Sequence, residues 1–399
     1  MFADLKPKGV DPLMALMQAF KADPREQKVD LVVGVYKDDA GRVPVLSSVK
    51  TAEDRLLREE DTKNYVGVLG DSELARLVPD LLLGTQSGLS GGGRVRSLQT
   101  PGGCGALKVG FDFVSSMAPG GRIWMSTPTW ANHAPIAQGS HLNVLYHPYF
   151  RAEDRSLDFD AMMAHLKAEA KTGDTLLLHA CCHNPTGVDL NLDQWTVVTE
   201  FVQGRGLLPF VDCAYQGFGK GLDEDVAGLR HMAERVPEML IASSFSKNFG
   251  IYRERAGALT VLGETKEQTD HAMAALGGLV RSNYSMPPSH GARIVTEVFK
   301  DEALHAEWLE ELAVMRTRIA ENRVTLRRKM EERQVGADIS FLTDQVGMFS
   351  YTGFTPDQVL RLREEFGIFT AADGRINVAG LSSGNMDVVA EGFAAVLRG

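Results

Sequence analysis

Between residues 95 and 265, short apolar runs of strand character alternate with segments whose apolar residues recur at helical spacing. Strands that alternate with helices in this way are typical of a wound α/β sheet with mostly parallel strands. Two of the helical segments are Phe159–Ala170 and Gln194–Val202. The runs that we predict to be strands are Val95–Leu98, Arg122–Met125, Thr175–His179, Leu208–Val211, Met239–Ser243 and Gly257–Leu262.

The pattern changes after the last of these strands. Ala292–Val335 contains neither glycine nor proline and carries an apolar stripe at helical spacing, which predicts one or two long helices. Strands near Met348–Tyr351 and Ile376–Ala379 and helices near Pro356–Phe366 and Met386–Leu397 then suggest a smaller α+β unit. We therefore predict a large domain over residues 45–310 and a small domain formed by residues 1–44 together with 311–399, because chain ends often lie near each other.

The segment before the sheet also carries local signals. Asp11-Pro12 has the form of a helix start, with Asp as the N-cap and Pro at the first position. Val29–Val35 predicts a short strand, Ser48–Glu60 an amphipathic helix, and Ser87–Gly93 a flexible connection.

Charge and cysteine usage narrow the class of protein. The net charge is −10, whereas nucleic-acid binders usually carry a basic face, so we expect no nucleic-acid partner. The four cysteines form no C-x-x-C pair, which favours free thiols in a reducing compartment. The N-terminus has no secretory h-region, and no run reaches the about 18 apolar residues that a membrane helix needs. We expect a cytoplasmic protein without a membrane partner.

Polar residues follow three of the predicted strands directly. Lys247, Asp212 and Asn184 stand just after apolar runs, at the strand ends where α/β proteins bind ligands. A lysine that is partly buried there can form a Schiff base, and a carboxylate can hold a proton on a ring nitrogen. Each residue also has an ordinary structural explanation as part of a turn or cap.

A glycine-rich loop, Thr100–Lys108, opens a helix after the first predicted strand. Backbone N–H groups at such a helix start can bind phosphate, although the loop has neither Walker nor G-x-G-x-x-G spacing. Arg255, Arg281 and Arg375 could each be an ordinary surface charge, but an arginine between apolar neighbours more often has an anionic partner. A lysine, an acid for a ring nitrogen, an Asn/Tyr pair and a phosphate loop at one crevice are the parts that a pyridoxal-phosphate enzyme needs.

The segment His179-x-Cys181-Cys182-His183 contains residue types that bind metals. Neighbouring residues of a strand point to opposite faces, and the sequence offers no second ligand cluster to complete a tetrahedral site. We therefore expect no metal, with buried thiols and packed histidines instead.

Taken together, the motifs resemble those of class I aminotransferases of the aspartate and aromatic amino-acid aminotransferase group. The resemblance runs almost from end to end. The motifs that carry it are VVGVYKD at 32–38, KNYVG at 63–67, TPGGCGAL at 100–107, PTWANH at 128–133, HNPTG at 183–187, DCAYQGF at 212–218, SFSKNFGIYRER at 244–255, RSNYSMPP at 281–288 and GRINVAG at 374–380.

The resemblance implies a fold-type I homodimer with pyridoxal 5′-phosphate bound in the large domain and active sites shared between subunits. It implies that Lys247 is the Schiff-base lysine and proton shuttle and that Asp212 pairs with the pyridine nitrogen. At the cofactor ring, it implies that Tyr215 and Asn184 contact the phenolic oxygen and that Trp130 stacks on the ring. At the phosphate, it implies Ser244, Arg255 and the Gly103 and Cys104 amides, with Tyr65 from the other subunit. For the substrate, it implies that Arg375 binds the α-carboxylate with help from Gly34 and Asn184, and that Arg281 reaches across the dimer to a distal carboxylate.

The chain departs from the family pattern in ways that bear on its substrates. Cys104 replaces a usual Thr or Ser, and a thiol is a weak hydrogen-bond donor. Met286 stands where aspartate-specific members often have Asn or Ser, which favours aromatic rings, whereas Lys37 and Asn64 match the aspartate-preferring pattern. The resemblance thus implies a ping-pong transfer of the amino group of aromatic amino acids, aspartate or both to 2-oxoglutarate.

Alternatives remain at this point. Within the fold they are an aspartate-specific aminotransferase and a lyase or β-decarboxylase. From another class, a cofactor-binding regulator without catalysis is disfavoured, because such regulators carry an extra DNA-binding domain and residues 1–30 are too short for one.

Overall fold

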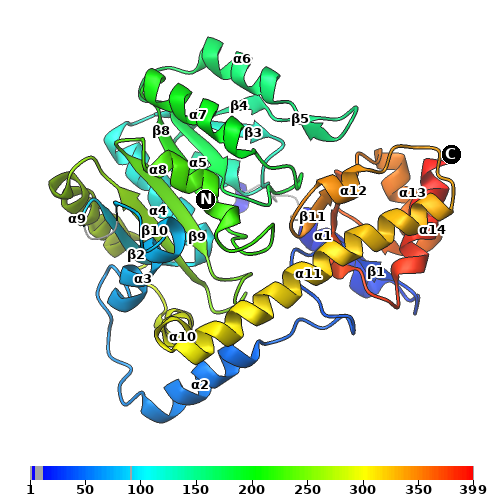
Figure 1. Cartoon of the computed structure of the whole chain (residues 1–399), viewed down its shortest axis with the longest axis horizontal. Helices are drawn as coiled ribbons and strands as arrows, with labels where there is room; N and C mark the ends of the chain where they lie inside the picture. The colour runs from blue at the N-terminus through cyan, green and yellow to red at the C-terminus, as the bar shows by residue number, and fades with distance from the viewer. Residues whose placement is uncertain (1, 5–11, 90–91, 399) are drawn as a thin grey trace.

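The computed structural model of the chain describes residues 2–4, 12–89 and 92–398. A seven-stranded sheet with the order β2-β10-β9-β8-β7-β3-β4 forms its centre (Figure 1). β10 is antiparallel to both of its neighbours, and the other adjacent pairs are parallel. The strands are β2 (Val95–Pro101), β3 (Arg122–Thr127), β4 (Asn143–Pro148), β7 (Thr175–His179), β8 (Leu208–Cys213), β9 (Met239–Ser244) and β10 (Ala256–Leu262).

The six strands predicted from the sequence are all present, and the mostly parallel α/β sheet is confirmed. The prediction missed β4, the strand at one edge of the sheet. Only one of its residues, His147, is fully buried, and Asn143 and Tyr146 are exposed. An edge strand that is only partly buried has no continuous apolar run, so the sequence pattern does not show it.

Helices cover both faces of the sheet. On one face lie α4 (Gly102–Met117), α5 (His133–Gly139) and α9 (Lys266–Asn283). On the other lie α3 (Ser72–Leu83), α6 (Phe159–Glu169), α7 (Leu192–Arg205), α8 (Ala227–Ala233) and α10 (Ser289–Lys300). Each face has its own apolar core: Leu176 and Leu178 belong to one, and Leu177, between them, belongs to the other. Strands buried on both faces read as continuous apolar runs, which is why the sequence located them.

The register aligns the carboxyl ends of the parallel strands β7, β8 and β9 along one edge of the sheet. His179 at the end of β7 is opposite Asp212 in β8, and Cys213 is opposite Ser243 in β9. Because β10 runs the other way, its first residue, Ala256, reaches the same edge. The loops that follow β2, β3, β7, β8 and β9 and the turn before β10 therefore meet along a single edge.

A 31-residue helix, α11 (Glu302–Glu332), leads away from the sheet (Figure 1). It ends among α12, α13, α14, β11, β12 and β13, which we call the C-terminal lobe, drawn in orange and red in Figure 1. These elements are α12 (Phe341–Asp344), α13 (Pro356–Phe366), α14 (Met386–Leu397), β11 (Phe349–Tyr351), β12 (Ile368–Phe369) and β13 (Arg375–Asn377).

Elements before the sheet connect to both parts. The helix α2 (Ser47–Glu59) packs against α10 and α11, while β1 (Val29–Asp30) pairs in parallel with β12. The latter pairing ties the N-terminal segment to the C-terminal lobe, as the predicted small domain requires, although the boundaries 1–44, 45–310 and 311–399 stay predictions. The remaining elements are α1 (Pro12–Ala22), the short pair β5 (Phe150–Arg151) and β6 (Ser156–Leu157), and the 3-10 helices η1 (Phe2–Asp4), η2 (Glu224–Val226) and η3 (Val378–Gly380).

Most other element predictions agree with the structure. The glycine- and proline-free stretch forms the end of α10 and all of α11. β1 is shorter than the predicted strand Val29–Val35 because the chain leaves the pairing after Asp30. The predicted N-cap Asp11 and part of the predicted connection Ser87–Gly93 lie outside the described residues.

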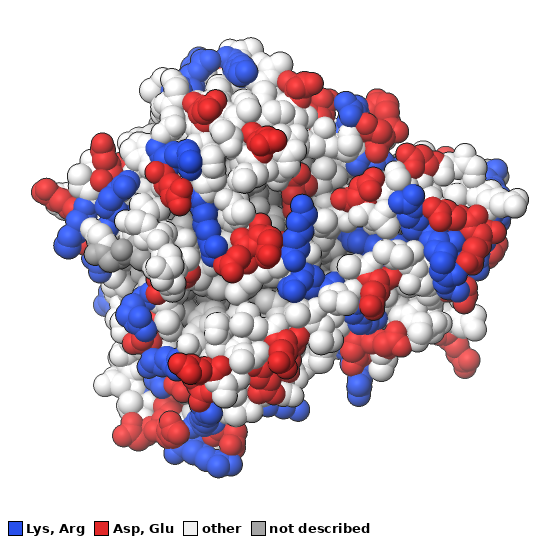
Figure 2. Space-filling view, viewed as in Figure 1, with Lys and Arg blue, Asp and Glu red and all other residues white. Residues whose placement is uncertain are grey.

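Figure 2 shows basic and acidic side chains mixed over the visible face rather than gathered by sign. No helix among the described residues combines the length and apolar character that crossing a bilayer requires.

Candidate functional site

A cavity of about 400 Å³ opens at the edge of the sheet where the strand ends meet. All but two of the residues predicted for the site line it. They are Gly34, Gly103, Cys104, Trp130, Asn184, Asp212, Tyr215, Ser244, Lys247, Arg255 and Arg375. Asp212 is the one acidic residue among the lining residues, so the cavity has an excess of positive charge that suits anionic ligands.

Lys247 lies in the turn that follows β9 and is largely buried. Its Nζ atom stands over the ring of Tyr215, 4.7 Å from the ring centroid, and makes no ion pair with a described residue. Burial lowers the pKa of the Lys247 amine although the Asp212 carboxylate works against this shift. A lysine with a lowered pKa can serve as a nucleophile and as a base near neutral pH.

Asp212 lies near the end of β8 and is buried. Its Oδ2 atom is 3.0 Å from Nε2 of His133, and Nδ1 of the same imidazole is 2.8 Å from Oγ1 of Thr129. Burial alone would raise the pKa of Asp212, but the hydrogen bond with His133, with help from the charge of Lys247, brings it below its ordinary value. The carboxylate is therefore ionised and held in a fixed orientation.

One end of the cavity is built to hold a multiply charged anion. The helix α4 starts here, and its N-cap residue, Pro101, provides no side-chain cap for the first N–H groups. The guanidinium of Arg255 lies against this first turn: a Cβ added at Gly102 would be 2.6 Å from its Nη2 atom. Arg255 Nη1 donates to the backbone carbonyl of Tyr252 at 2.9 Å, which fixes the guanidinium in place. Free N–H groups and a fixed cation together suit a phosphate.

Cys104 lies in this first turn of α4 and is half-buried. Its sulfur accepts a hydrogen bond from Nδ2 of Asn132 at 3.6 Å. Burial raises the pKa of the thiol even though Arg255 is nearby, so the thiol is neutral at physiological pH. It offers only a weak S–H donor to the cavity.

Arg375 enters the cavity from β13 of the C-terminal lobe. Its Nη1 atom donates to Oδ1 of Asn184 at 3.3 Å, Nη2 donates to the carbonyl of Val32 at 2.9 Å, and the guanidinium lies 4.4 Å from the centroid of the Phe349 ring. Its buried Nε atom has no partner among the described residues, and the side chain makes no ion pair with them. The guanidinium can therefore take a carboxylate from a ligand.

Two aromatic residues complete the walls. Trp130 follows β3 and packs edge-on against His133, with ring centroids 5.2 Å apart. Tyr215 follows β8 and is buried, and burial raises the pKa of its hydroxyl well above the ordinary range, so it is a neutral donor.

The sequence predicted packed histidines at His179 and His183, but it assigned neither them nor His133 a role in the site. The ring centroids of His133 and His179 are 5.2 Å apart, and those of His179 and His183 are 4.1 Å apart. Burial lowers the pKa of His179 to about 3, so its imidazole is neutral. His133 stands in the motif PTWANH, but only the fold reveals its contact with Asp212. Other lining residues that were not predicted are Leu13, Leu107, Asn132, Ala214, Ser246, Tyr252 and Phe349.

The structure does not bring Tyr65 and Arg281 to this cavity. Tyr65 is 88% exposed. Arg281 is exposed near the end of α9, where its Nη1 atom donates to Oγ of Ser285 at 2.9 Å. Their predicted roles require a second subunit and stay predictions. Lys37 forms an ion pair with Asp30 at 2.9 Å, so its amine already has a partner within the chain.

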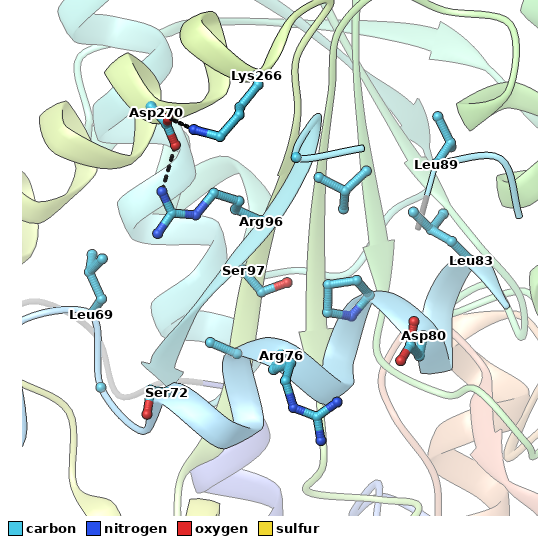
Figure 3. Close-up of a pocket in the computed structure, with 15 residues that line it drawn as sticks. Leu69, Ser72, Arg76, Asp80, Leu83, Leu89, Arg96, Ser97, Lys266 and Asp270 are labelled. Atoms are coloured by element: carbon cyan, nitrogen blue, oxygen red, sulfur yellow. Dashed lines mark hydrogen bonds and ion pairs between the residues drawn. The ribbon is translucent and has the colours of Figure 1, made fainter. Parts of the chain in front are cut away.

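A larger cavity, of about 610 Å³, lies between α3, β2 and the start of α9 (Figure 3). Its cationic side chains are paired with neighbouring acids: Arg96 and Lys266 both bind Asp270. None of the predicted site residues lines it.

Comparisons with known proteins agree on one family. Residues 26–393 match the family described as aminotransferase class I and II. The chain is 47% identical to an aspartate aminotransferase of Salmonella typhi, with both chains covered in full. It is 45% identical to an aromatic-amino-acid aminotransferase of Pseudomonas aeruginosa, over 97% of this chain and 96% of that one.

The solved structures give the same result. One neighbour is an aromatic-amino-acid aminotransferase from Burkholderia pseudomallei that is covalently bound to pyridoxal phosphate. It superposes with a TM-score of 0.98 at 42% identity and covers 100% of this chain and 99% of that chain.

Proposed function

The chain belongs to the class I and II aminotransferase family and is a pyridoxal-phosphate-dependent transaminase of fold type I, and from this premise we propose which residues carry the reaction and which substrates it takes. The observation that supports the assignment most is that Lys247, Asp212, Arg375 and the uncapped start of α4 all open into one cavity.

The residues of the cavity fit the cofactor. Arg255, Ser244 and the first N–H groups of α4 offer donors and positive charge for the phosphate. Asp212, ionised and fixed by His133, fits a protonated ring nitrogen. The remaining contacts that we propose are the Trp130 ring face on the cofactor ring and the side chains of Asn184 and Tyr215 on its phenolic oxygen.

Lys247 is the residue that we propose holds the cofactor covalently through Nζ. When bound, the cofactor supplies an electron sink for the negative charge that develops at the substrate Cα. The carboxylate of Asp212 supports this sink because it keeps the proton on the ring nitrogen. Nζ of Lys247, whose pKa is lowered by burial, would act as the base that takes the proton from the substrate Cα and returns it during the amino transfer.

Arg375 orients the substrate for this proton transfer. Its unpaired guanidinium can bind the α-carboxylate, and the contact with Asn184 fixes the direction of the fork. Gly34 lies beside this clamp against Phe349: a Cβ at that position would come within 2.7 Å of the Phe349 ring. A larger residue at position 34 would therefore displace the ring that supports the arginine.

We propose that the donors are both aspartate and aromatic amino acids and that 2-oxoglutarate is the acceptor, in a ping-pong sequence. Of two relatives at similar identity, one is named an aspartate aminotransferase and the other an aromatic-amino-acid aminotransferase. We further propose a homodimer in which the partner subunit's Arg281 binds the distal carboxylate and the partner's Tyr65 reaches the phosphate; both side chains are exposed in one chain. An aspartate-specific enzyme or a lyase of the same fold is the alternative.

A cytoplasmic location is part of the same proposal. It is supported by the four cysteines, all of which are free thiols in the structure.

The test begins with the visible spectrum of the purified protein. We expect a band from the lysine-bound cofactor that shifts when aspartate or phenylalanine is added. Lys247→Ala should still bind the cofactor through the phosphate-binding groups but lose transamination by several orders of magnitude. Near-normal turnover by this variant would contradict the assignment of Lys247.

The proposed substrate range is tested by measuring the single-turnover rate of the half-reaction with each amino donor. Arg281→Ala should slow the half-reaction with aspartate by a hundredfold or more, because a substrate carboxylate is left buried without a partner. The phenylalanine half-reaction should change by less than about tenfold. Equal losses with both donors would contradict the proposed dual specificity, and elimination products in place of 2-oxo acids would indicate the lyase.

A further inference from the structure

Three potential metal ligands meet behind the cavity. They are His133 at the start of α5, His179 at the end of β7 and Asp212 near the end of β8, and one ligand atom from each lies within 4.8 Å of the others. From the sequence we expected no metal, because it offers no second cluster of ligands to complete a site at His179. The fold supplies that cluster from two other segments of the chain.

The ligand types are those of transition-metal sites. Two imidazoles and a carboxylate, with an open fourth position, are a common set for Zn²⁺ and Co²⁺, with bonds of about 2.0–2.2 Å. Ligand atoms of a tetrahedral ion stand a little over 3 Å apart at such bond lengths. Nε2 of His133 and Oδ2 of Asp212 are already 3.0 Å apart, so the main adjustment is an approach by His179, whose ligand atom lies within 4.8 Å of both.

The hydrogen bonds of these side chains allow them to bind an ion. The Nε2 atom of His179 is buried and has no partner among the described residues. His133 can bind through Nε2 if its proton moves to Nδ1, where Oγ1 of Thr129 lies 2.8 Å away and can accept it. A hydrogen bond from the outer nitrogen of a ligating imidazole is the usual second contact of a metal-bound histidine.

We propose that the cofactor-free protein binds one divalent transition-metal ion through His133, His179 and Asp212, and that the ion and the cofactor exclude each other. The cavity provides the access route and leaves the fourth position open to solvent, since His179 and Asp212 both line it. The exclusion rests on the proposed function, in which Asp212 binds the ring nitrogen. Lys247 and Arg255 oppose a cation in the same cavity, so the affinity comes from the three ligands alone.

Two other places in the molecule are less suited to a ligand. Cys181, Cys182 and Asp225 also bring ligand atoms within 4.8 Å of one another. However, both oxygens of Asp225 already accept backbone N–H groups, including those of Gly217 at 2.8 Å and Lys220 at 2.7 Å. In the cavity of Figure 3 the charged side chains neutralise one another, and nothing in the structure indicates an occupant.

The experiment uses the full chain freed of cofactor and treated with a chelator. Co²⁺ is titrated while the visible d–d absorption is recorded, and Zn²⁺ binding is measured by calorimetry. We expect one ion per chain, with an affinity at least tenfold lower in His179→Asn and in His133→Asn. His141→Asn is the matched control: His141 is exposed near the start of β4, and its substitution should leave the affinity unchanged. Thermal unfolding confirms that each variant is folded.

Competition is measured by adding pyridoxal 5′-phosphate, removing free ligands by gel filtration and counting the metal that remains on the protein. Inorganic phosphate serves as the control for an effect of the phosphate group alone. Loss of the ion with the cofactor, but not with phosphate, is the expected result. Binding that does not depend on His133 and His179 would overturn the metal site. An ion that survives cofactor loading would overturn the exclusion, and with it the proposed placement of Asp212 at the ring nitrogen, while leaving Lys247 and the transaminase activity untouched.

Discussion

At the proposed phosphate end of the cavity, we expect a single sulfur atom, that of Cys104, to influence how tightly the cofactor is held. Cys104 lies in the first turn of α4, where a hydroxyl would be a better donor than the thiol. We expect Cys104→Ser to bind pyridoxal 5′-phosphate about two- to tenfold more tightly, because one added hydrogen bond contributes about 0.5–1.5 kcal/mol. Equilibrium dialysis of the cofactor-free protein measures the effect.

Cys104→Ala separates the added hydroxyl from the loss of the sulfur. It should bind the cofactor no more tightly than the parent. A gain of the same size in both variants would mean that the sulfur hinders the phosphate by its bulk rather than by its weak donor.

Buried histidines should make the protein sensitive to mild acid. Burial lowers the pKa of His147 to about 4 and that of His179 to about 3, whereas both would titrate near 6.5 in the unfolded chain. Between these values the unfolded state binds more protons than the folded state, so stability falls as the pH drops below 6.5. Each of the two histidines should lower the free energy of unfolding by about 1.36 kcal/mol for each pH unit below 6.5. At pH 5 the loss is therefore about 2 kcal/mol for each histidine relative to pH 7.5.

His147→Gln tests this contribution, because an amide can still donate to the carbonyl of Pro148, as Nδ1 of His147 does at 2.8 Å. Urea unfolding at pH 7.5 and pH 5 should show a smaller loss of stability in the variant, by about 2 kcal/mol. His271→Gln, at an exposed position, is the control and should lose as much stability between pH 7.5 and pH 5 as the parent protein. A variant as acid-sensitive as the parent would show that His147 is protonated in the folded state.

Some of the predicted site residues follow from a physical reason, and the others from the family resemblance. A polar side chain directly after a buried parallel strand must lie at the ligand-binding edge, so Lys247, Asp212 and Asn184 could be found without coordinates. His133 could not, because its effect depends on a contact with Asp212, 79 residues further along the chain. Tyr65 and Arg281 point to a limit of another kind, since their predicted roles involve a second chain.

Among the secondary-structure elements, α11 shows how an apolar stripe can contain a charge. Arg323 occupies a position of the predicted stripe and is buried. Its guanidinium donates to the backbone carbonyls of Leu342, Gly347 and Phe349 and to Oγ of Ser350. One side chain thus satisfies the acceptors of the segment that leads into β11.

Replacing this arginine should therefore destabilise the C-terminal lobe. We expect Arg323→Met to lower the free energy of unfolding by about 3 kcal/mol or more, because buried carbonyls lose their donors although the volume is largely kept. The control Arg328→Met removes an exposed arginine that pairs with Glu332 on the same helix, and should cost less than about 1 kcal/mol. Similar losses in both variants would contradict the role of Arg323.

Strands that are buried on both faces of the sheet were predictable, and the partly exposed strand β4 was not. The strands β7, β8 and β9 are continuous apolar runs because helices cover both faces of the sheet. β4 lacks such a run because it is half-exposed. β1 was predicted, but over too many residues, because the apolar run Val29–Val35 is longer than the two residues that pair. The extent of β1 depends on β12, a partner that lies far away in the sequence.

At the scale of the whole molecule, the proposed homodimer predicts complementation between two inactive chains. In a mixed dimer of Lys247→Ala and Arg281→Ala chains, one of the two sites combines an intact Lys247 with an intact Arg281 from the partner. Activity with aspartate should therefore return to half of the sites of each mixed dimer. Single-turnover amplitudes after subunit exchange give that fraction.

The matched control mixes Lys247→Ala with Arg375→Ala. Lys247 and Arg375 line the same cavity within one chain, so neither site of the mixed dimer is complete and no activity should return. Recovery in both mixtures, or in neither, would contradict a site that takes Arg281 from the partner.

The antiparallel β10 also bears on the order in which the molecule is assembled during synthesis. Every group proposed to hold the cofactor within one chain lies before this strand, whereas Arg375 lies far beyond it. On the ribosome, where domains form from the N-terminal side, β10 is the last strand to emerge and closes the sheet between β9 and β2. The residues proposed to bind the cofactor are thus synthesised first, and Arg375, proposed to bind the substrate carboxylate, follows only when the C-terminal lobe has been translated.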